Sequence, residues 1–170
     1  MLLVYTGNGK GKTSASLGQC VRAVGGGLSV IFVQFMKKDH VAGEQKVLST
    51  LPGVRWYAGG KGFFRKESQR DDHRAAAEET YLWTLDQLEK PEPCHMLIMD
   101  ECLYALGAGL LTREEVQRVI DLTAARGIHL VLSGRGLPDW LKEQAQLVTE
   151  MREIKHPIHQ GISAAKGIEY

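Results

Sequence analysis

The chain has little of what secreted and membrane-spanning proteins have in abundance. It contains three cysteines, Cys20, Cys94 and Cys102, and no Cys-x-x-Cys pair, so we expect reduced thiols and no cysteine metal site. No apolar run approaches the roughly 20 residues of a membrane helix. The opening MLLVYTG lacks the basic flank and the long apolar segment of a signal peptide. We therefore expect a cytoplasmic protein that binds no membrane.

The chain also lacks an excess of charge of either sign. Its 21 lysines and arginines nearly balance 20 aspartates and glutamates, which leaves a formal net charge of +1. Such a balance gives no general field for nucleic acid, so it disfavours a DNA-binding role and predicts no nucleic-acid partner. No internal repeat or low-complexity tract is visible. With 170 residues, we expect a single domain that spans residues 1–170 and buries a core.

A glycine-rich loop near the start is the most informative stretch of the chain. It lies between an apolar run at 2–5 and a helical pattern, and it reads Thr6-Gly7-Asn8-Gly9-Lys10-Gly11-Lys12-Thr13. Glycines allow backbone conformations that bring N–H groups toward one anion, and the following helix points its positive end at the same place. Lys12 can reach phosphates, and the Thr13 hydroxyl can bind Mg²⁺. This pattern predicts a Walker A phosphate loop.

One position departs from the usual Walker A pattern, because Thr6 stands where the first glycine is normally found. The alternative interpretation is a flexible glycine turn before a helix. The order of strand, loop, lysine, threonine and helix favours the phosphate loop. We therefore predict that Lys12 and Thr13 are catalytic. The predicted nucleotide-binding residues of the loop are Thr6, Gly7, Asn8, Gly9, Lys10, Gly11, Lys12, Thr13 and Ser14.

Apolar runs and helical periods alternate along the rest of the chain. The run at 28–35 is almost continuously apolar, as expected for a parallel strand covered on both faces. Strands are predicted at 2–5, 28–35, 54–57, 96–99, 128–133 and 147–154, and helices at 14–24, 44–51, 70–88, 112–127 and 137–144. The alternation predicts an α/β fold with three layers and a mostly parallel central sheet, of the P-loop NTPase (RecA-like) type.

Two further segments follow predicted strands, where ligands bind in such folds. Asp100 and Glu101 follow an apolar strand and fit a Walker B element that holds Mg²⁺. We predict a magnesium site formed by Thr13, Asp100 and Glu101; the alternative is a solvated acidic turn. Arg135 lies between two glycines after the next strand and is predicted to contact phosphate, unless it is an ordinary surface arginine. The pair His156 and His159 lacks further ligands, so we predict no metal there.

The segment 59–66 is rich in glycine, basic and aromatic. It contains two adjacent phenylalanines, Phe63 and Phe64, that no neighbouring residue in the sequence would bury. Two interpretations are open: the rings pack back on the core, or they meet an apolar ligand or a partner subunit.

These features together predict a protein that binds a magnesium–nucleotide complex. No guanine-reading Asn/Thr-Lys-x-Asp motif occurs, which favours ATP over GTP. The usual outcome of such a site is hydrolysis or transfer of the γ-phosphoryl group. A P-loop ATPase and a small-molecule kinase are therefore the general alternatives.

The chain resembles the ATP:corrinoid adenosyltransferases of the CobA/CobO/BtuR family over nearly its whole length. The phosphate loop matches that of the family, including the missing first glycine. The other matching stretches are Val33-Gln34-Phe35, Gly43-Glu44, Asp100-Glu101 with Tyr104, Ser133-Gly134-Arg135-Gly136, Lys155-His156 and Gly167-Ile168-Glu169-Tyr170. Together these stretches are specific to the family, whereas the phosphate loop alone would not be.

The resemblance implies an unusual use of ATP. In this family the Co(I) of a reduced corrinoid attacks the 5′ carbon of the ribose, and the products are an adenosylated corrinoid and tripolyphosphate. The loop, Lys12, Thr13 and Mg²⁺ would then stabilise the leaving triphosphate. Glu44, together with Asp100 or Glu101, would join the Mg–ATP site. The implied partners are ATP, a reduced cobalamin or cobinamide, a flavin-type reductase and a second copy in a homodimer.

The resemblance also suggests a function for the aromatic loop. In similar proteins a Gly-Phe-x-Trp stretch crowds the lower face of the corrin and displaces its axial base, which eases reduction of the cobalt. Here Phe63, Phe64 and Arg65 are the predicted corrinoid-binding residues, and Arg65 stands where the family has tryptophan.

Overall fold

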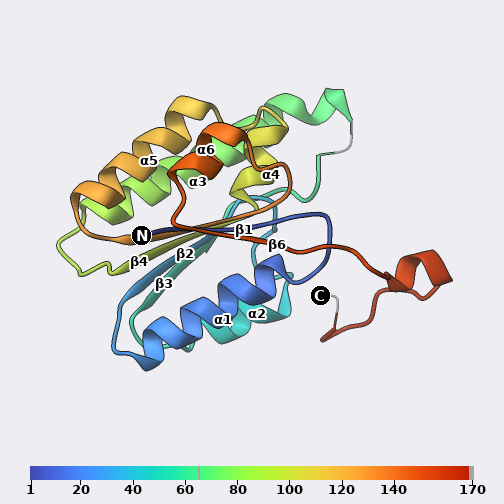
Figure 1. Cartoon of the computed structure of the whole chain (residues 1–170), viewed down its shortest axis with the longest axis horizontal. Helices are drawn as coiled ribbons and strands as arrows, with labels where there is room; N and C mark the ends of the chain where they lie inside the picture. The colour runs from blue at the N-terminus through green and yellow to red at the C-terminus, as the bar shows by residue number, and fades with distance from the viewer. Residues whose placement is uncertain (65, 169–170) are drawn as a thin grey trace.

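A six-stranded sheet forms the centre of the fold (Figure 1). The structure is a computed structural model that describes residues 1–64 and 66–168. The strand order is β3-β2-β4-β5-β1-β6, and every pair of neighbours is parallel. The strands are β1 (Leu2–Thr6), β2 (Val30–Gln34), β3 (Val54–Ala58), β4 (Met96–Asp100), β5 (His129–Ser133) and β6 (Leu147–Glu150). All carboxyl ends therefore meet at one edge of the sheet.

Two layers of helices cover the sheet, which confirms the predicted three-layer α/β fold (Figure 1). One face carries α1 (Lys12–Gly25) and α2 (Gly43–Leu48). The other face carries α3 (Arg70–Glu89), α4 (Cys102–Gly107), α5 (Arg113–Ala125) and α6 (Asp139–Gln144). Two short 3₁₀ helices complete the described elements, η1 (Glu67–Gln69) and η2 (Pro157–Gln160).

The central strands are buried on both faces, as their continuous apolar sequences predict. All five residues of β2 and all five of β4 are buried. Their apolar side chains divide between two clusters, one on each side of the sheet. The smaller cluster joins the sheet to α1 and α2 and includes Cys20, Phe32 and Leu48. Burial of each large apolar side chain contributes about 1.5–3 kcal/mol to the stability of the folded state. The sheet therefore holds the loops at its edge in fixed positions.

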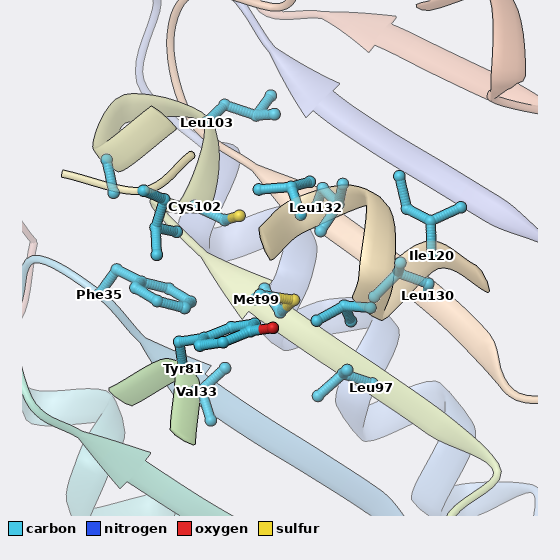
Figure 2. Packing of buried hydrophobic residues seen from close by; sticks show 14 of the residues in the cluster. Val33, Phe35, Tyr81, Leu97, Met99, Cys102, Leu103, Ile120, Leu130 and Leu132 are labelled. Atoms are coloured by element: carbon cyan, nitrogen blue, oxygen red, sulfur yellow. The ribbon is translucent and has the colours of Figure 1, made fainter. Parts of the chain in front are cut away.

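The larger cluster joins the sheet to α3, α4, α5 and α6. Figure 2 shows side chains from the sheet and from these helices gathered within it, among them Phe35 just after β2, Tyr81 of α3 and Leu103 of α4. The predicted helix at 70–88 is confirmed as α3, and Ala77, Tyr81, Thr84, Leu85 and Leu88 form its buried stripe.

A reciprocal capping box begins α5, as the sequence Thr112-Arg113-Glu114-Glu115 predicts. The Glu115 backbone N–H donates to Thr112 Oγ1 at 3.1 Å, and the Thr112 N–H donates to Glu115 Oε2 at 2.7 Å. The Glu115 carboxylate also accepts from Arg74 Nη2 of α3 at 2.8 Å. One side chain thus caps α5 and ties it to the neighbouring helix.

Beyond shifts of a few residues at the ends of elements, two differences from the prediction stand out. The helix α4 was not predicted, because its sequence CLYALG lacks the polar residues that mark the exposed face of the equally short α2 and α6. The last strand ends at Glu150 and not at residue 154. At that point the chain turns across the phosphate loop, where Met151 N donates to Thr6 O at 2.8 Å and Gly9 N donates to Met151 O at 2.7 Å.

No helix within residues 1–64 and 66–168 has both the length and the apolar character needed to cross a membrane.

We expect Thr112→Ala to lower the free energy of unfolding by about 1 kcal/mol, because the Glu115 N–H loses its acceptor. Chemical denaturation with parallel melts of Thr112→Ser, which keeps the hydroxyl, measures the effect. Equal stability of the alanine variant and the native chain would contradict the assigned cap.

Candidate functional site

A cleft with a volume of about 810 Å³ lies at the carboxyl edge of the sheet. Residues from the segments after β1, β2, β3, β4 and β5 line it together with the tail after β6. The lining residues are Gly9, Lys10, Gly11, Lys12, Thr13, Ser14, Leu17, Lys37, Gly43, Glu44, Phe63, Glu101, Arg135, His156, Ala164, Gly167 and Ile168. The fold thus brings the phosphate loop, Glu44, Glu101 and Arg135 to one cleft.

The conformation of the phosphate loop explains its glycines. Gly7 has a φ of 100°, and a Cβ atom there would lie 2.4 Å from the Met151 carbonyl oxygen. A Cβ atom on Gly9 would lie 2.8 Å from the same oxygen. Side chains at these two positions would therefore prevent residues 151–152 from crossing the loop. Thr6 still belongs to β1, so a strand residue with a side chain fits where the usual pattern has glycine.

Lys12 begins α1 and folds back over the loop. Its Nζ donates to the Gly9 carbonyl oxygen at 2.8 Å, and the residue is only 6% exposed. Burial lowers the pKa of Lys12; the nearby charges of Glu101 and Asp100 act in the opposite direction and that of Arg135 in the same one. The ammonium group thus lies at the base of the cleft with carboxylates near it.

Thr13, in the first turn of α1, faces Asp100, the last residue of β4. Thr13 Oγ1 lies 3.1 Å from each carboxylate oxygen of Asp100. Ser133 Oγ, at the end of β5, donates to Asp100 Oδ1 at 2.6 Å. Asp100 is fully buried, so these hydroxyl groups replace the water that would otherwise solvate its charge.

Glu101 has an unusual backbone conformation. Its φ of 58° is in the left-handed region, which is uncommon for a residue other than glycine and is found more often at functional sites. The Glu101 N–H donates to Ser133 Oγ at 3.1 Å. Burial raises the pKa of the Glu101 carboxyl group, and the neighbouring Asp100 raises it further, against the positive charges of Lys12, Lys37 and Arg135.

A polar network connects Asp100 to Glu44 of α2. Gln34 Nε2, at the end of β2, donates to Glu44 Oε1 at 3.2 Å and to Asp100 Oδ2 at 3.3 Å. Gln45 Nε2 donates to Gln34 Oε1 at 2.9 Å. Lys37 Nζ pairs with Glu44 and lies 3.8 Å from Asp100 Oδ2.

The network has opposing effects on Glu44. Burial acts to raise its pKa, but hydrogen bonds from Lys37, from the backbone and from Gln34, with the charge of Lys37, leave the pKa below its ordinary value. Sequence reasoning missed Lys37 and Gln45. The one available signal was a polar residue, Gln34, at the end of a buried strand.

The aromatic loop places its two phenylalanines differently. Phe63 is 57% exposed, lines the cleft, and meets the Tyr104 ring edge-on with centroids 5.5 Å apart. Phe64 is half-buried and packs between His73 and Arg70, while its carbonyl accepts from the Tyr104 hydroxyl at 3.2 Å. Phe64 therefore packs back on the core, whereas for the exposed Phe63 the contact with an apolar ligand or a partner subunit stays a prediction. The prediction for Arg65 lies outside the described residues.

The tail after β6 contributes His156 to the cleft wall. The His159 ring meets the His156 ring edge-on with centroids 6.0 Å apart, and its Nε2 lies 2.7 Å from Glu153 Oε1. Within residues 1–64 and 66–168 no group of three or more His, Cys, Asp or Glu side chains is placed to hold a metal ion by itself. A magnesium ion in the cleft would therefore need oxygen atoms from elsewhere, such as phosphates and water.

The three-layer parallel fold, with a glycine-rich loop between its first strand and first helix, defines an α/β protein of the P-loop NTPase-like class. Comparison with known families narrows this class. The sequence model of the family "ATP:corrinoid adenosyltransferase BtuR/CobO/CobP" matches residues 1–170. The chain belongs to this family.

Several curated relatives are similar along the full chain. A corrinoid adenosyltransferase of Pseudomonas aeruginosa is 36% identical over 173 residues, which cover 100% of this chain and 83% of the relative. The corrinoid adenosyltransferase CobA of Salmonella typhimurium is 34% identical over 173 residues, with 100% and 85% covered. A corrinoid adenosyltransferase of Escherichia coli K12 is 33% identical over 170 residues, with the same coverage.

We expect Glu101→Gln to raise the melting temperature of the ligand-free protein above neutral pH. The folded-state pKa of Glu101 lies above its ordinary value of 4.5, so ionisation opposes folding once the pH exceeds that value. The gain should be present at about pH 8 and become small at about pH 4, where the group is mostly protonated in both states.

Thermal melts at both pH values measure the difference, with Glu143→Gln on the exposed surface of α6 as the control. A glutamine variant that melts below the native chain at about pH 8 would contradict the electrostatic account of this residue.

Proposed function

We propose that this chain transfers the 5′-deoxyadenosyl group of ATP to the Co(I) of a reduced corrinoid and releases tripolyphosphate. The observation that supports it best is the composition of one cleft, which is lined both by the phosphate loop and by the exposed Phe63. A triphosphate on the loop and a flat apolar macrocycle beside Phe63 would lie next to each other. Membership of a corrinoid adenosyltransferase family over the full chain agrees with this pairing.

In the proposed reaction the leaving group is the whole triphosphate. The lone pair of Co(I) forms a bond to the ribose 5′ carbon, and the bond between that carbon and the α-phosphate oxygen breaks. Its electron pair departs with tripolyphosphate, and the cobalt is formally oxidised to Co(III). Negative charge would therefore grow on the oxygens bound beside the loop and Lys12 Nζ, and preorganised donors at such a place lower the barrier.

The residues proposed to bind ATP are those of the loop with two residues from neighbouring segments. Lys12 and Thr13 are assigned the catalytic function, because they reach the phosphates directly. Arg135 is exposed and lines the cleft, where it would add positive charge beside the triphosphate. The full proposed set is Thr6, Gly7, Asn8, Gly9, Lys10, Gly11, Lys12, Thr13, Ser14, Glu44 and Arg135.

The residues present fit a magnesium ion held together with the triphosphate. The Thr13 hydroxyl and the Asp100 carboxylate lie 3.1 Å apart, and these are the hard oxygen donors that Mg²⁺ prefers. Thr13 and Asp100 would hold the ion, with Glu101 beside them and with Glu44 joined to Asp100 through the shared Gln34 amide. When bound, the ion supplies positive charge to the triphosphate oxygens.

The exposed Phe63 is the residue proposed to face the lower side of the corrin. It is held from behind by Tyr104, whose ring contacts it edge-on. Phe64 remains a proposed corrinoid-binding residue, but through its backbone atoms, since its ring packs inward. Contact of Phe63 with the macrocycle would exclude the axial base and ease reduction of Co(II).

We also propose the finer features that the resemblance implies. These are a homodimer in the cytoplasm, a flavin-type reductase as electron donor, and cobalamin or cobinamide as the corrinoid. Free thiols at Cys20, Cys94 and Cys102 are compatible with a reducing compartment.

One observation favours the alternative of a P-loop ATPase. Glu101 lies next to Asp100, lines the cleft and has a raised pKa, as a base that activates water would. Hydrolysis or a kinase reaction would release ADP, whereas adenosyl transfer releases tripolyphosphate. The product therefore separates the two functions.

We expect the native chain to convert chemically reduced cobalamin and Mg–ATP to adenosylcobalamin, and Lys12→Ala to lose about 100-fold or more in turnover, because the charge that stabilises the leaving group is removed. The visible spectrum of the corrinoid measures the reaction. Lys142→Ala, on the exposed surface of α6, is the matched control. Release of ADP without adenosylated corrinoid would contradict the proposal, and near-native turnover of Lys12→Ala would contradict the function given to Lys12.

We expect Phe63→Ala to slow the reaction that starts from Co(II) several-fold more than the reaction that starts from prereduced Co(I), because only the first needs the axial base displaced. Both rates are measured with the same enzyme preparation. Val21→Ala, which shortens an equally exposed apolar side chain on α1, is the control. Equal losses from the two starting states would show that the ring only binds the corrinoid.

A further inference from the structure

Lys37 lies in the cleft but has no part in the phosphate loop. It follows β2, and its side chain is 30% exposed. Its Nζ pairs with Glu44 Oε1 and lies 3.8 Å from Asp100 Oδ2. These two carboxylates are the ones that the proposed function gives to magnesium and ATP, so a lysine ammonium already occupies the space between them.

The arrangement of the two carboxylates is fixed by a second donor. Gln34 Nε2 donates to the same two oxygen atoms, Glu44 Oε1 and Asp100 Oδ2, at 3.2 and 3.3 Å. Gln45 holds the Gln34 amide from the other side at 2.9 Å. Neutral amide groups therefore hold these two carboxylate oxygens close together, as the Lys37 ammonium does.

Burial makes a cation necessary at this position. The side chain of Asp100 is 0% exposed and that of Glu44 is 17% exposed. Two poorly solvated carboxylates that share hydrogen-bond donors repel each other unless a positive charge lies near both. Among the described residues Lys37 forms the ion pairs that meet this need.

A divalent ion bound by Thr13 and Asp100 would compete with the Lys37 ammonium for the negative charge of the Asp100 carboxylate. Both Asp100 oxygens lie 3.1 Å from the Thr13 hydroxyl, while Oδ2 also faces Lys37. A magnesium ion against this carboxylate would repel the ammonium group. Lysine has a long flexible stem, so the ammonium can turn toward solvent or toward a ligand in the cleft without a change in the backbone.

We propose that Lys37 is an internal counter-cation that competes with Mg²⁺ for Glu44 and Asp100, and that it passes to the triphosphate oxygens when the metal arrives with ATP. This inference rests on the proposed magnesium–ATP site. Its consequence is ordered binding: a divalent ion enters with the triphosphate and not before it, because only the triphosphate offers the displaced ammonium a new partner. Lys37 then joins Lys12 and Arg135 around the leaving group.

Binding of Mn²⁺ without nucleotide tests the competition. We expect Lys37→Met to bind Mn²⁺ with a dissociation constant at least about tenfold lower than that of the native chain, because the competing charge is absent. Free Mn²⁺ is measured by its electron paramagnetic resonance signal. Lys38→Met is the matched control, since it removes the same charge from an exposed neighbour that makes no ion pair with either carboxylate; it should bind Mn²⁺ as the native chain does.

Two further variants separate competition from a general loss of structure. Lys37→Arg keeps the charge and should bind Mn²⁺ as weakly as the native chain. The double variant Lys37→Met with Glu44→Gln removes one carboxylate as well, and it should lose the affinity gained by the single variant. Equal affinity of Lys37→Met and Lys38→Met would overturn the proposal.

A second measurement uses the native chain alone and does not depend on whether a variant folds. We expect inorganic tripolyphosphate to raise the affinity of the native chain for Mn²⁺ at least about tenfold, beyond the Mn²⁺ that free tripolyphosphate takes up in a blank without protein. Tight binding of Mn²⁺ to the native chain without tripolyphosphate would overturn the proposal. No corrinoid is present in either measurement, so failure here is distinct from failure of adenosyl transfer.

Discussion

The buried carboxylate of Asp100 is the group on which the arrangement of the cleft depends. It accepts from the Ser133 hydroxyl and the Gln34 amide, faces Thr13, and lies 3.8 Å from the Lys37 ammonium. These partners come from the ends of β5 and β2, from α1 and from the loop after β2. A charge without water must be satisfied by protein groups, and satisfying this one brings the four segments of the cleft together.

The parallel sheet explains why the segments can meet. Because β5 lies between β1 and β4, Ser133 reaches Asp100 on one side and the phosphate loop lies on the other. The Tyr104 ring, in the helix after β4, contacts the Phe63 ring at the same edge of the sheet. One cleft is therefore lined both by the phosphate loop and by an aromatic side chain. A site of this shape suits a reaction in which the triphosphate leaves and the ribose carbon faces an apolar partner. In this account the loop holds the leaving group and not the group that is transferred.

The sequence predicted the features that depend on local pattern and missed those that depend on distant contacts. Continuous apolar runs predicted β2 and β4, and the spacing of Thr112 and Glu115 predicted the cap of α5, because short-range physics determines both. The crossing of the phosphate loop by Met151 joins residues far apart in the chain, so no local pattern reveals it. Lys37 was missed for the same reason: its partners Glu44 and Asp100 meet only when the sheet has formed. The residues assigned to ATP, magnesium and the corrinoid stay predictions.

The position of the bond that breaks tests the central claim most directly. ATP that carries ¹⁸O at the oxygen between the 5′ carbon and the α-phosphorus is incubated with the protein, Mg²⁺ and reduced cobalamin, and the phosphate products are examined by mass spectrometry. The account predicts that the label is recovered in tripolyphosphate, because the bond from carbon to oxygen is the one cleaved. Recovery of the label in ADP, with unlabelled inorganic phosphate beside it, would contradict the account.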